Sequence, residues 1–276
     1  MEHWICVTCG AQFAASQEPP TGCPICLDQR QYVGQQGQQW TTLARMRQEG
    51  YQNSITEEEP RLTGIVTQPS FAIGQRALLV QTDQGNVLWD CITYLDDQTV
   101  QAVQALGGIS AIAASHPHLY GSMIEWAERF QARIYLHEAD RRWVMRPDER
   151  ITFWSGETLP LLDDLTLIRL GGHFPGSTVL HWPQGAEGRG TLLTGDSIYV
   201  VADRAWVSFM YSYPNLIPLP AREIRRMRDA IAPYRFDRLY SGFPGRVVDA
   251  DASAAVQRSA ERYLKAIEVG LEGDIS

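Results

Sequence analysis

Three segments of the chain carry histidines or a carboxylate that could bind one metal ion. The stretch SHPHLYG, residues 115–121, contains His116 and His118 two positions apart. In extended backbone, side chains at i and i+2 project to the same face, so both imidazoles can reach one ion. The loop GGHFPGS adds His173, and the strand-like run LLTGD ends in Asp196. Three histidines and one carboxylate are a ligand set that suits Zn²⁺ or Fe²⁺.

Cysteines form a second candidate metal site. Cys6, Cys9, Cys23 and Cys26 make two C-x-x-C pairs within the first thirty residues, whereas Cys91 stands alone. Four thiolates can close a tetrahedral shell around Zn²⁺ or iron, and the bound ion then supplies the folding free energy that so short a segment lacks. The clustering indicates a metal site rather than disulfides. Cys91 follows an apolar run and is interpreted as an inert buried residue.

Composition and charge are those of an ordinary globular protein. The 276 residues are 44% hydrophobic and 20% charged, with a formal net charge of −8. Because phosphate binding needs clustered Lys and Arg, this balance argues against a nucleic-acid partner, and the basic run at 222–228 has the spacing of a solvated helix face. No apolar stretch reaches the ~18 residues of a membrane span. The start MEHWIC lacks the features of a secretion signal, so we expect a cytoplasmic protein without a membrane partner.

The pattern of strands and helices divides the chain. We expect three parts, in chain order: a four-cysteine module over 1–35, a linker over 36–60, and a main domain over 61–276. The runs LTGIVTQ, RALLVQT and NVLWDC predict strands, and a helix over 122–130 follows with Ser122 and Glu125 as a capping box. Strand pairs followed by alternating strands and helices indicate a mixed α+β sandwich with helices on the outside.

The main domain resembles the metallo-β-lactamase fold superfamily. The matching pieces are NVLWDC with Asp90, SHPHLYG, GGHFPGS, LLTGDSI and LYSGFPG, in the family's order and approximate spacing, and they cover about residues 61–270. The resemblance implies an αββα sandwich around a metal centre that activates water. It also makes Asp90 a candidate for orienting a ligating imidazole.

The first thirty residues resemble rubredoxin-like and zinc-ribbon modules. Trp4, Phe13 and the segment PPTGCPIC match the short form of these modules, although Leu27 stands where they usually have glycine. The resemblance implies zinc or iron at the four cysteines, and zinc is the simpler expectation. Such a module is either a structural clip or an electron-transfer centre.

The superfamily motif H-x-H-x-D-H is incomplete in this chain. His116 and His118 match its first two histidines, but Tyr120 stands in the aspartate position and Gly121 in the last histidine position. The late histidine of the second metal site corresponds to Phe243. All three residues that would serve the second ion alone are therefore replaced.

The ligands of the first ion remain complete. His173 is present, and so is Asp196, which usually bridges both ions. The pattern favours a mononuclear zinc or iron centre, with an empty vestigial site and an alternative second ligand set as the other interpretations. Its expected ligands are His116, His118, His173 and Asp196.

Three functions fit these residues. The first is a mononuclear metal-dependent hydrolase of an ester, thioester, lactone or amide, with Asp196 and Tyr120 as candidate catalytic residues. The second is a mononuclear iron redox enzyme to which the cysteine module supplies electrons. The third is a non-catalytic protein that binds a partner. Tyr120 could equally fill the space that the second ion has vacated.

The aromatic-rich segment 200–218 closely follows Asp196. It could form a pocket wall, a lid or the contact of a homodimer, and it favours a small-molecule substrate with apolar or acyl character. The remaining histidines, His3, His137 and His181, are interpreted as structural residues.

Overall fold

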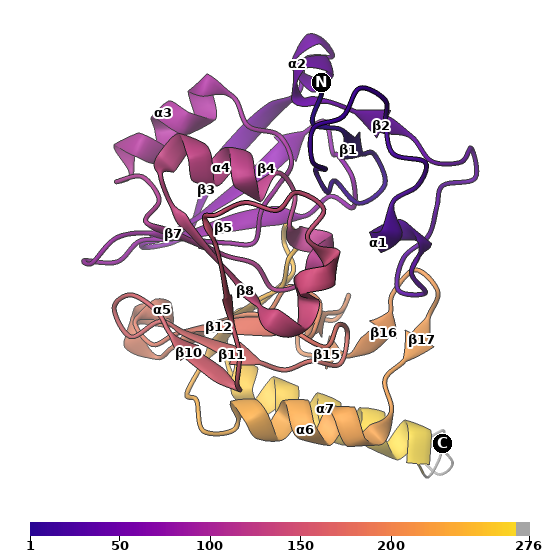
Figure 1. The fold of residues 1–276 in the computed structure, drawn as a ribbon. Helices are drawn as coiled ribbons and strands as arrows, with labels where there is room; N and C mark the ends of the chain where they lie inside the picture. The colour runs from indigo at the N-terminus through magenta and orange to yellow at the C-terminus, as the bar shows by residue number, and fades with distance from the viewer. Residues whose placement is uncertain (269–276) are drawn as a thin grey trace.

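The computed structural model describes residues 1–268 and consists of two packed β-sheets between two layers of helices (Figure 1). The first sheet runs in chain order, with antiparallel pairing up to β6 and parallel pairing from there on. Its strands are β3 (Gln52–Glu59), β4 (Leu62–Gln68), β5 (Arg76–Val80), β6 (Val87–Trp89), β7 (Ala111–Ala113), β8 (Arg133–His137) and β9 (Ile151–Trp154).

The second sheet is antiparallel except for one parallel pair, β13 with β18. Its strands are β10 (Thr158–Pro160), β11 (Thr166–Arg169), β12 (Thr178–Trp182), β13 (Thr191–Leu193), β18 (Arg238–Tyr240) and β19 (Val247–Val248). Two short hairpins lie between β13 and β18 in the chain: β14 (Tyr199–Val200) with β15 (Val207–Ser208), and β16 (Met210–Ser212) with β17 (Ile217–Pro218).

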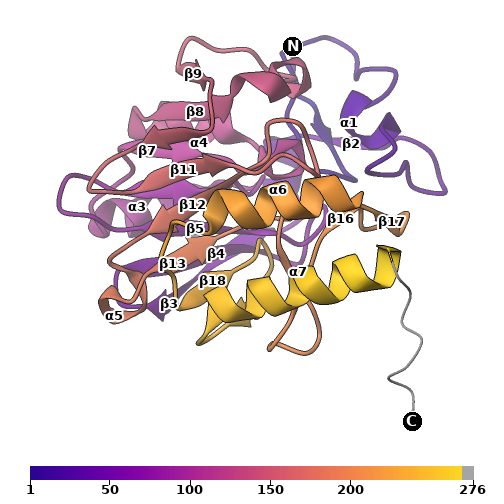
Figure 2. The same cartoon turned by 90° about the horizontal axis from the view of Figure 1, so that it is seen from below.

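Helices cover the outer face of each sheet. Side chains of α3 (Asp97–Ala105) and α4 (Met123–Phe130) pack on the first sheet. Helices α6 (Ala221–Ile231) and α7 (Ala252–Glu268) lie side by side on the second sheet (Figure 2). The shorter helices are α1 (Pro24–Leu27), α2 (Leu43–Gln48), α5 (Gly185–Gly188) and the 3₁₀ turns η1 (Pro117–Leu119) and η2 (Glu138–Trp143).

The period-two alternation of the strands produces this layering. In β5, Leu78 and Val80 face the second sheet, whereas Ala77 and Leu79 face the helical layer. Both faces of the strand are buried, so its sequence is apolar throughout. The α+β sandwich expected from the sequence is therefore confirmed.

The N-terminal module packs against the first sheet and its helices. Strand β1 (Ile5–Cys6) pairs with β2 (Trp40–Thr41), and the cysteines share one hydrophobic core with residues of the main domain such as Met123 and Trp126. Strand β3 lies in the range 36–60 that the sequence predicts to be a linker. It is an edge strand on which Glu57 is exposed, Glu58 half-buried and Glu59 buried in an ion pair with Arg238. Its polar composition therefore does not resemble that of a core strand.

The capping box expected for α4 does not form. Ser122 precedes the helix, but its hydroxyl donates a hydrogen bond to the carbonyl of Thr93 at 2.6 Å instead of capping the helix. The hydroxyl bonds Thr93 because the loop that carries Thr93 packs against the start of the helix. A local sequence pattern cannot show this contact, since the two residues lie far apart in the chain.

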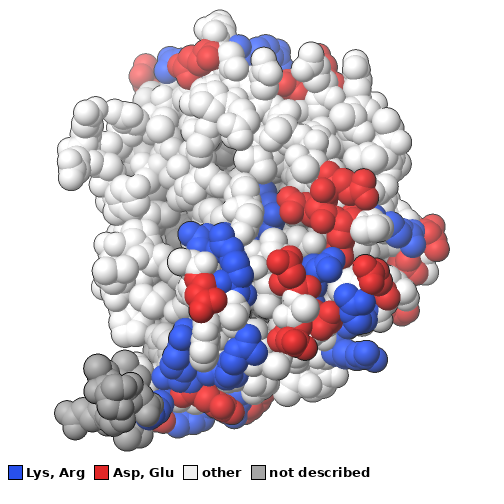
Figure 3. Space-filling view, turned by 180° about the vertical axis from the view of Figure 1, so that it is seen from behind, with Lys and Arg blue, Asp and Glu red and all other residues white. Residues whose placement is uncertain are grey.

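Charges on the surface are mixed. Arginines of α6 are ion-paired with acidic neighbours, as in Arg226 with Glu223 and Arg225 with Glu268. Figure 3 shows acidic and basic side chains interspersed on one face of the molecule. None of the helices within residues 1–268 combines the length and apolar character needed to cross a membrane.

Candidate metal centre

Loops that follow three strands of the two sheets bring the predicted ligands together. His116 and His118 follow β7 in the first sheet, whereas His173 follows β11 and Asp196 follows β13 in the second. The site therefore lies where the two sheets open at one edge of the sandwich. All four side chains are buried, with at most 5% of each residue exposed.

The four ligand atoms are spaced as a metal ion requires. Nδ1 of His118 lies 3.2 Å from Nε2 of His173, and Nε2 of His116 lies 3.4 Å from Oδ2 of Asp196. All four ligand atoms lie within 4.8 Å of one another. Tetrahedral zinc with bonds of about 2.0–2.1 Å separates its nitrogen ligands by about 3.3 Å. The residues therefore fit a single bound ion.

Hydrogen bonds leave the metal-facing atoms available. Nδ1 of His173 donates to the carbonyl of Tyr211 at 2.9 Å, which directs the Nε2 lone pair toward His118. Nδ1 of His116 bonds the hydroxyl of Ser115 at 2.9 Å. Oδ1 of Asp196 is buried and makes no hydrogen bond within residues 1–268, as expected of an oxygen that serves an ion.

Electrostatics keep these residues in their metal-binding forms. Burial, reinforced by the neighbouring histidines, lowers the pKa of His118 well below its usual value and that of His173 to about 3. Burial raises the pKa of Asp196, but its contact with His116 and the charges of His116 and His173 outweigh this and bring the pKa below its usual value. At neutral pH the imidazoles of His118 and His173 are neutral and the carboxylate is ionised.

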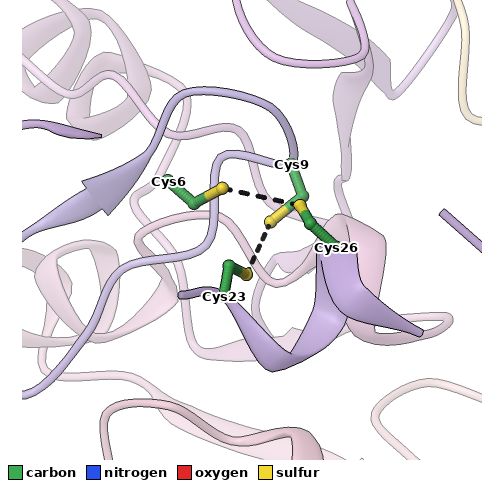
Figure 4. A group of neighbouring side chains, drawn as sticks. All are labelled: Cys6, Cys9, Cys23 and Cys26. Carbon is green, nitrogen blue, oxygen red and sulfur yellow. Dashed lines mark hydrogen bonds between the residues drawn. The ribbon is translucent and has the colours of Figure 1, made fainter. Parts of the chain in front are cut away.

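The four cysteines form a second, separate centre. Figure 4 shows their side chains turned toward one another, Cys6 and Cys9 from the end of β1 and the turn after it, Cys23 and Cys26 from the start of α1 and the helix itself. The sulfur–sulfur distances are 3.5 Å between Cys6 and Cys26 and 3.7 Å between Cys9 and Cys23. Zinc–sulfur bonds of about 2.3 Å set neighbouring sulfurs about 3.8 Å apart, so this cluster could also hold one metal ion. Gln38 supports it by donating a hydrogen bond to Cys6.

Comparison with protein families shows to which family the large domain belongs. Residues 72–242 match the family model of the metallo-beta-lactamase superfamily, which is more than half of the chain. The chain belongs to the metallo-beta-lactamase superfamily. It is also 56% identical over 268 residues to the uncharacterized protein YmaE of Bacillus subtilis (strain 168), and this alignment covers 97% of each chain.

Solved structures of superfamily members share the fold at low sequence identity. The metallo-beta-lactamase DIM-1 superimposes with a TM-score of 0.58 at 14% identity, over 78% of this chain and 98% of DIM-1. VMB-1 gives 0.57 at 15% identity with the same coverage. A B3 metallo-beta-lactamase with an active-site glutamic acid gives 0.53 at 18% identity, over 84% of this chain and 95% of that one. These likenesses concern the fold alone.

Asp90 and Ser115 form hydrogen bonds that lead to His116. Oδ1 of Asp90 accepts a hydrogen bond from the backbone N–H of Ser115 at 2.7 Å, and Ser115 in turn bonds His116. Asp90 is thus linked to His116 through Ser115, a residue that the sequence had not singled out, and a role of Asp90 in orienting this imidazole stays a prediction. The only signal for Ser115 in the sequence was its position next to the ligand. Burial raises the pKa of Asp90 to about 7.

The residues at the positions of the superfamily's second-ion ligands make other contacts. Gly121 has a left-handed backbone, φ +49°, and a Cβ there would lie 2.7 Å from the carbonyl oxygen of Ile92. The Phe243 ring packs against Tyr199 with centroids 5.7 Å apart. Tyr120 is 4% exposed and belongs to the core that the cysteine module shares with α4.

A cavity of about 200 Å³ opens onto the metal centre. Among its lining residues, Tyr199, Tyr213 and Phe243 form an aromatic side, and Tyr213 and Pro214 show that segment 200–218 contributes a pocket wall. Tyr120 is not among the lining residues and borders a separate cavity of only about 10 Å³. A catalytic role for Tyr120 stays a prediction, and its contacts correspond to the alternative of filling space.

The other three histidines make structural hydrogen bonds. His137 accepts from the N–H of Ala139 and caps η2. His181 bonds the carbonyl of Arg235 at 2.8 Å, and His3 bonds the carbonyl of Phe13 at 2.9 Å. Cys91 is fully buried, and burial raises its pKa well above the usual value, which disfavours a nucleophilic thiolate.

Proposed function

We propose that the protein is a metal-dependent hydrolase with one ion in the histidine centre, acting on an ester, thioester, lactone or amide. One observation carries the proposal: of the group formed by three histidines and Asp196, the side chains of His118, His173 and Asp196 line an open cavity large enough for a small acyl group. A metal site at the wall of a pocket has room for both water and a substrate carbonyl.

The contacts at the second-ion positions support a single ion. A histidine at position 121 would need space that the Ile92 carbonyl occupies, and Phe243 offers no ligand atom. Tyr120 is directed to a different cavity. The two-metal clamp that suits phosphodiester cleavage is therefore not part of the proposed mechanism.

The chain's own residues divide the remaining work. When bound there, zinc would supply a water whose pKa is lowered to about 7 and a Lewis acid that polarises a carbonyl. The three imidazoles and the Asp196 carboxylate would hold the ion. Oδ1 of Asp196, which is buried and lacks a hydrogen bond in the described chain, is the oxygen that could accept a proton from water. The aromatic wall of Tyr199 and Phe243 excludes water from the acyl side of the substrate.

The pocket favours an uncharged, apolar acyl group. Its aromatic and aliphatic side chains outnumber the polar ones, which are Arg30 and Gln31 apart from the ligands themselves. Burying such a group against Tyr213 or Phe243 gains about 25 cal/mol per Å² of apolar surface. A small aromatic or short aliphatic ester or thioester is the substrate class that we infer.

Metal analysis and turnover together test the proposal. The protein is purified without added metal, its zinc and iron are counted per chain, and hydrolysis of p-nitrophenyl esters, thioesters and lactones is measured. His173→Ala is compared with His3→Ala, a histidine outside the centre. We expect two ions per chain in the wild type and in His3→Ala, one ion in His173→Ala, and turnover that only His173→Ala abolishes.

The same measurement separates the other functions. A red protein with iron at both sites and no hydrolysis would replace the proposal by a redox enzyme. Two zinc ions without turnover of any substrate in the panel would favour a partner-binding protein. Hydrolysis that survives in His173→Ala would place the chemistry elsewhere in the molecule.

A further inference from the structure

Arg30 belongs to the cysteine module but lies at the metal centre of the main domain. It follows Cys26 by four residues and is only 8% exposed. It lines the cavity together with His118 and His173. An arginine is buried at low free-energy cost only when its donors and its flat faces are satisfied, so its contacts indicate what it does.

Hydrogen bonds and two aromatic rings hold the Arg30 side chain in place. Nε donates to the backbone carbonyl of His173 at 2.5 Å, and Nη1 donates to Asp28 at 2.6 Å. Its guanidinium carbon lies 4.5 Å from the ring centroids of both Phe174 and Tyr211, so the group is stacked between two aromatic rings. These contacts fix one orientation of the arginine.

Arg30 contacts the glycine-rich loop that carries His173. His173 follows Gly171 and Gly172, which have positive φ angles of 60° and 76°. The loop closes through hydrogen bonds from the N–H groups of Gly171 and Phe174 to Ser177, and Arg30 adds a contact to the His173 carbonyl from outside the loop. Phe174 lies beneath the imidazoles of His118 and His173, with ring centroids 5.0 and 5.1 Å away, so Arg30 and the ligands share this ring as a support.

A second tie joins the module to the segment that orients His173. The hydroxyl of Ser212 donates to the Arg30 carbonyl at 3.1 Å, and Nδ2 of Asn215 donates to the carbonyls of Gln29 and Gln31 at 2.9 and 3.1 Å. Ser212 directly follows Tyr211, whose carbonyl accepts the Nδ1 proton of His173. The module therefore holds both the backbone of this ligand and the partner of its ring.

We propose that Arg30 is a positioning residue of the histidine metal centre, through which the four-cysteine module holds the His173 loop in its metal-binding geometry. Filling of the cysteine site then raises the metal affinity of the histidine site. By thermodynamic linkage the effect is reciprocal. The inference rests on metal binding by the histidine centre, which is one part of the proposed function, and not on hydrolysis.

Cobalt titration tests the proposal without any substrate. Thiolate ligands give Co²⁺ intense near-ultraviolet absorption, so this band reports the cysteine site, and competition with a chromophoric chelator gives the affinity of the histidine site. The variants are Arg30→Gln and the milder Asn215→Ala, which keeps Arg30 and removes only the tie to Gln29 and Gln31. The control is Arg262→Gln, an arginine stacked on Trp206 at 3.7 Å on helix α7.

The expected results differ between the variants. Arg30→Gln keeps the thiolate band and weakens metal binding at the histidine site by about 10–100-fold, which is the range for residues that orient metal ligands. Asn215→Ala weakens it by less, and Arg262→Gln leaves it within about twofold of the wild type. An unchanged affinity in a folded Arg30→Gln variant overturns the proposal. If that variant does not fold, an unchanged affinity in Asn215→Ala overturns it instead.

Because the readout is metal affinity, the two proposals fail separately. A protein that binds metal as described but hydrolyses nothing contradicts the proposed function and leaves the role of Arg30 intact. A protein that hydrolyses the substrates, but whose metal affinity at the histidine site does not change in Arg30→Gln, contradicts the role of Arg30 and leaves the proposed function intact.

Discussion

Nε2 of His173 lies 3.2 Å from Nδ1 of His118, and the bond from His173 to the Tyr211 carbonyl turns its lone pair toward this contact. Two imidazoles from different sheets are thus held at the separation of two ligands on one ion. The folded protein keeps this arrangement against the conformational freedom of two loops. An ion that joins the two loops should therefore stabilise the folded state.

Metal binding at the histidine site should raise the free energy of unfolding. With the cysteine site already filled, free zinc at 100 times its dissociation constant should add about 2.7 kcal/mol. Thermal unfolding with and without zinc, followed by chelation, measures this gain. His173→Ala should show no such response, and a wild-type melting temperature that ignores zinc would contradict the prediction.

Gly121 should tolerate no larger residue. Gly121→Ala places a Cβ 2.7 Å from the Ile92 carbonyl oxygen in a left-handed backbone, and we expect a loss of about 1–3 kcal/mol. Gly50→Ala is the matched control, because Gly50 also has a positive φ but no atom within 4 Å of the added Cβ. Urea unfolding of both variants separates steric overlap from backbone strain. Equal losses would mean that overlap contributes nothing.

Tyr120 should act through packing rather than through its hydroxyl. Tyr120→Phe keeps the buried ring, so we expect the metal content and kcat/KM to stay within about threefold of the wild type. Tyr120→Ala opens a void next to the cysteine module and should cost about 3–5 kcal/mol. Kinetics and urea unfolding on the two variants distinguish the roles. A large fall of kcat in Tyr120→Phe would restore the phenol as a catalytic group.

Asp140 should make the folded protein less stable as pH rises. Burial raises its pKa to about 6, against a hydrogen bond from the N–H of Gly176 that acts in the other direction, and Oδ2 is buried without a hydrogen-bond partner in residues 1–268. Since the folded state holds this proton more tightly than the unfolded state, stability falls between about pH 4 and pH 6. Above pH 6 the buried charge of Asp140 lowers the free energy of unfolding by up to about 3 kcal/mol.

Asp140→Asn removes this charge and should stabilise the protein by about 1–3 kcal/mol at pH 8, and by less at pH 5. Urea unfolding at the two pH values measures the difference. The exposed Asp249, whose Asp249→Asn variant serves as control, should show little change at either pH. If Asp140→Asn stabilises the protein more at pH 5 than at pH 8, the prediction that folding raises the pKa of Asp140 is wrong.

The local sequence contained the metal ligands and the layering of the fold. His116 and His118 two residues apart, the Gly-rich loop before His173 and the strand before Asp196 placed each ligand at a strand end, and the two C-x-x-C pairs defined the second centre. The alternation of β5 side chains between the two faces of the first sheet followed from strand geometry alone. Such features depend on spacings of a few residues, which a sequence displays directly.

Tertiary structure decided the remaining features, because they join positions far apart in the chain. Arg30 reaches His173 across 143 residues, and Ser122 leaves its expected helix cap for Thr93. The acidic edge strand β3 pairs with β4 although its composition resembles a linker. No local pattern encodes which distant backbone carbonyl a side chain will meet. Only the packing of the module on the sandwich brings Arg30 to the metal centre.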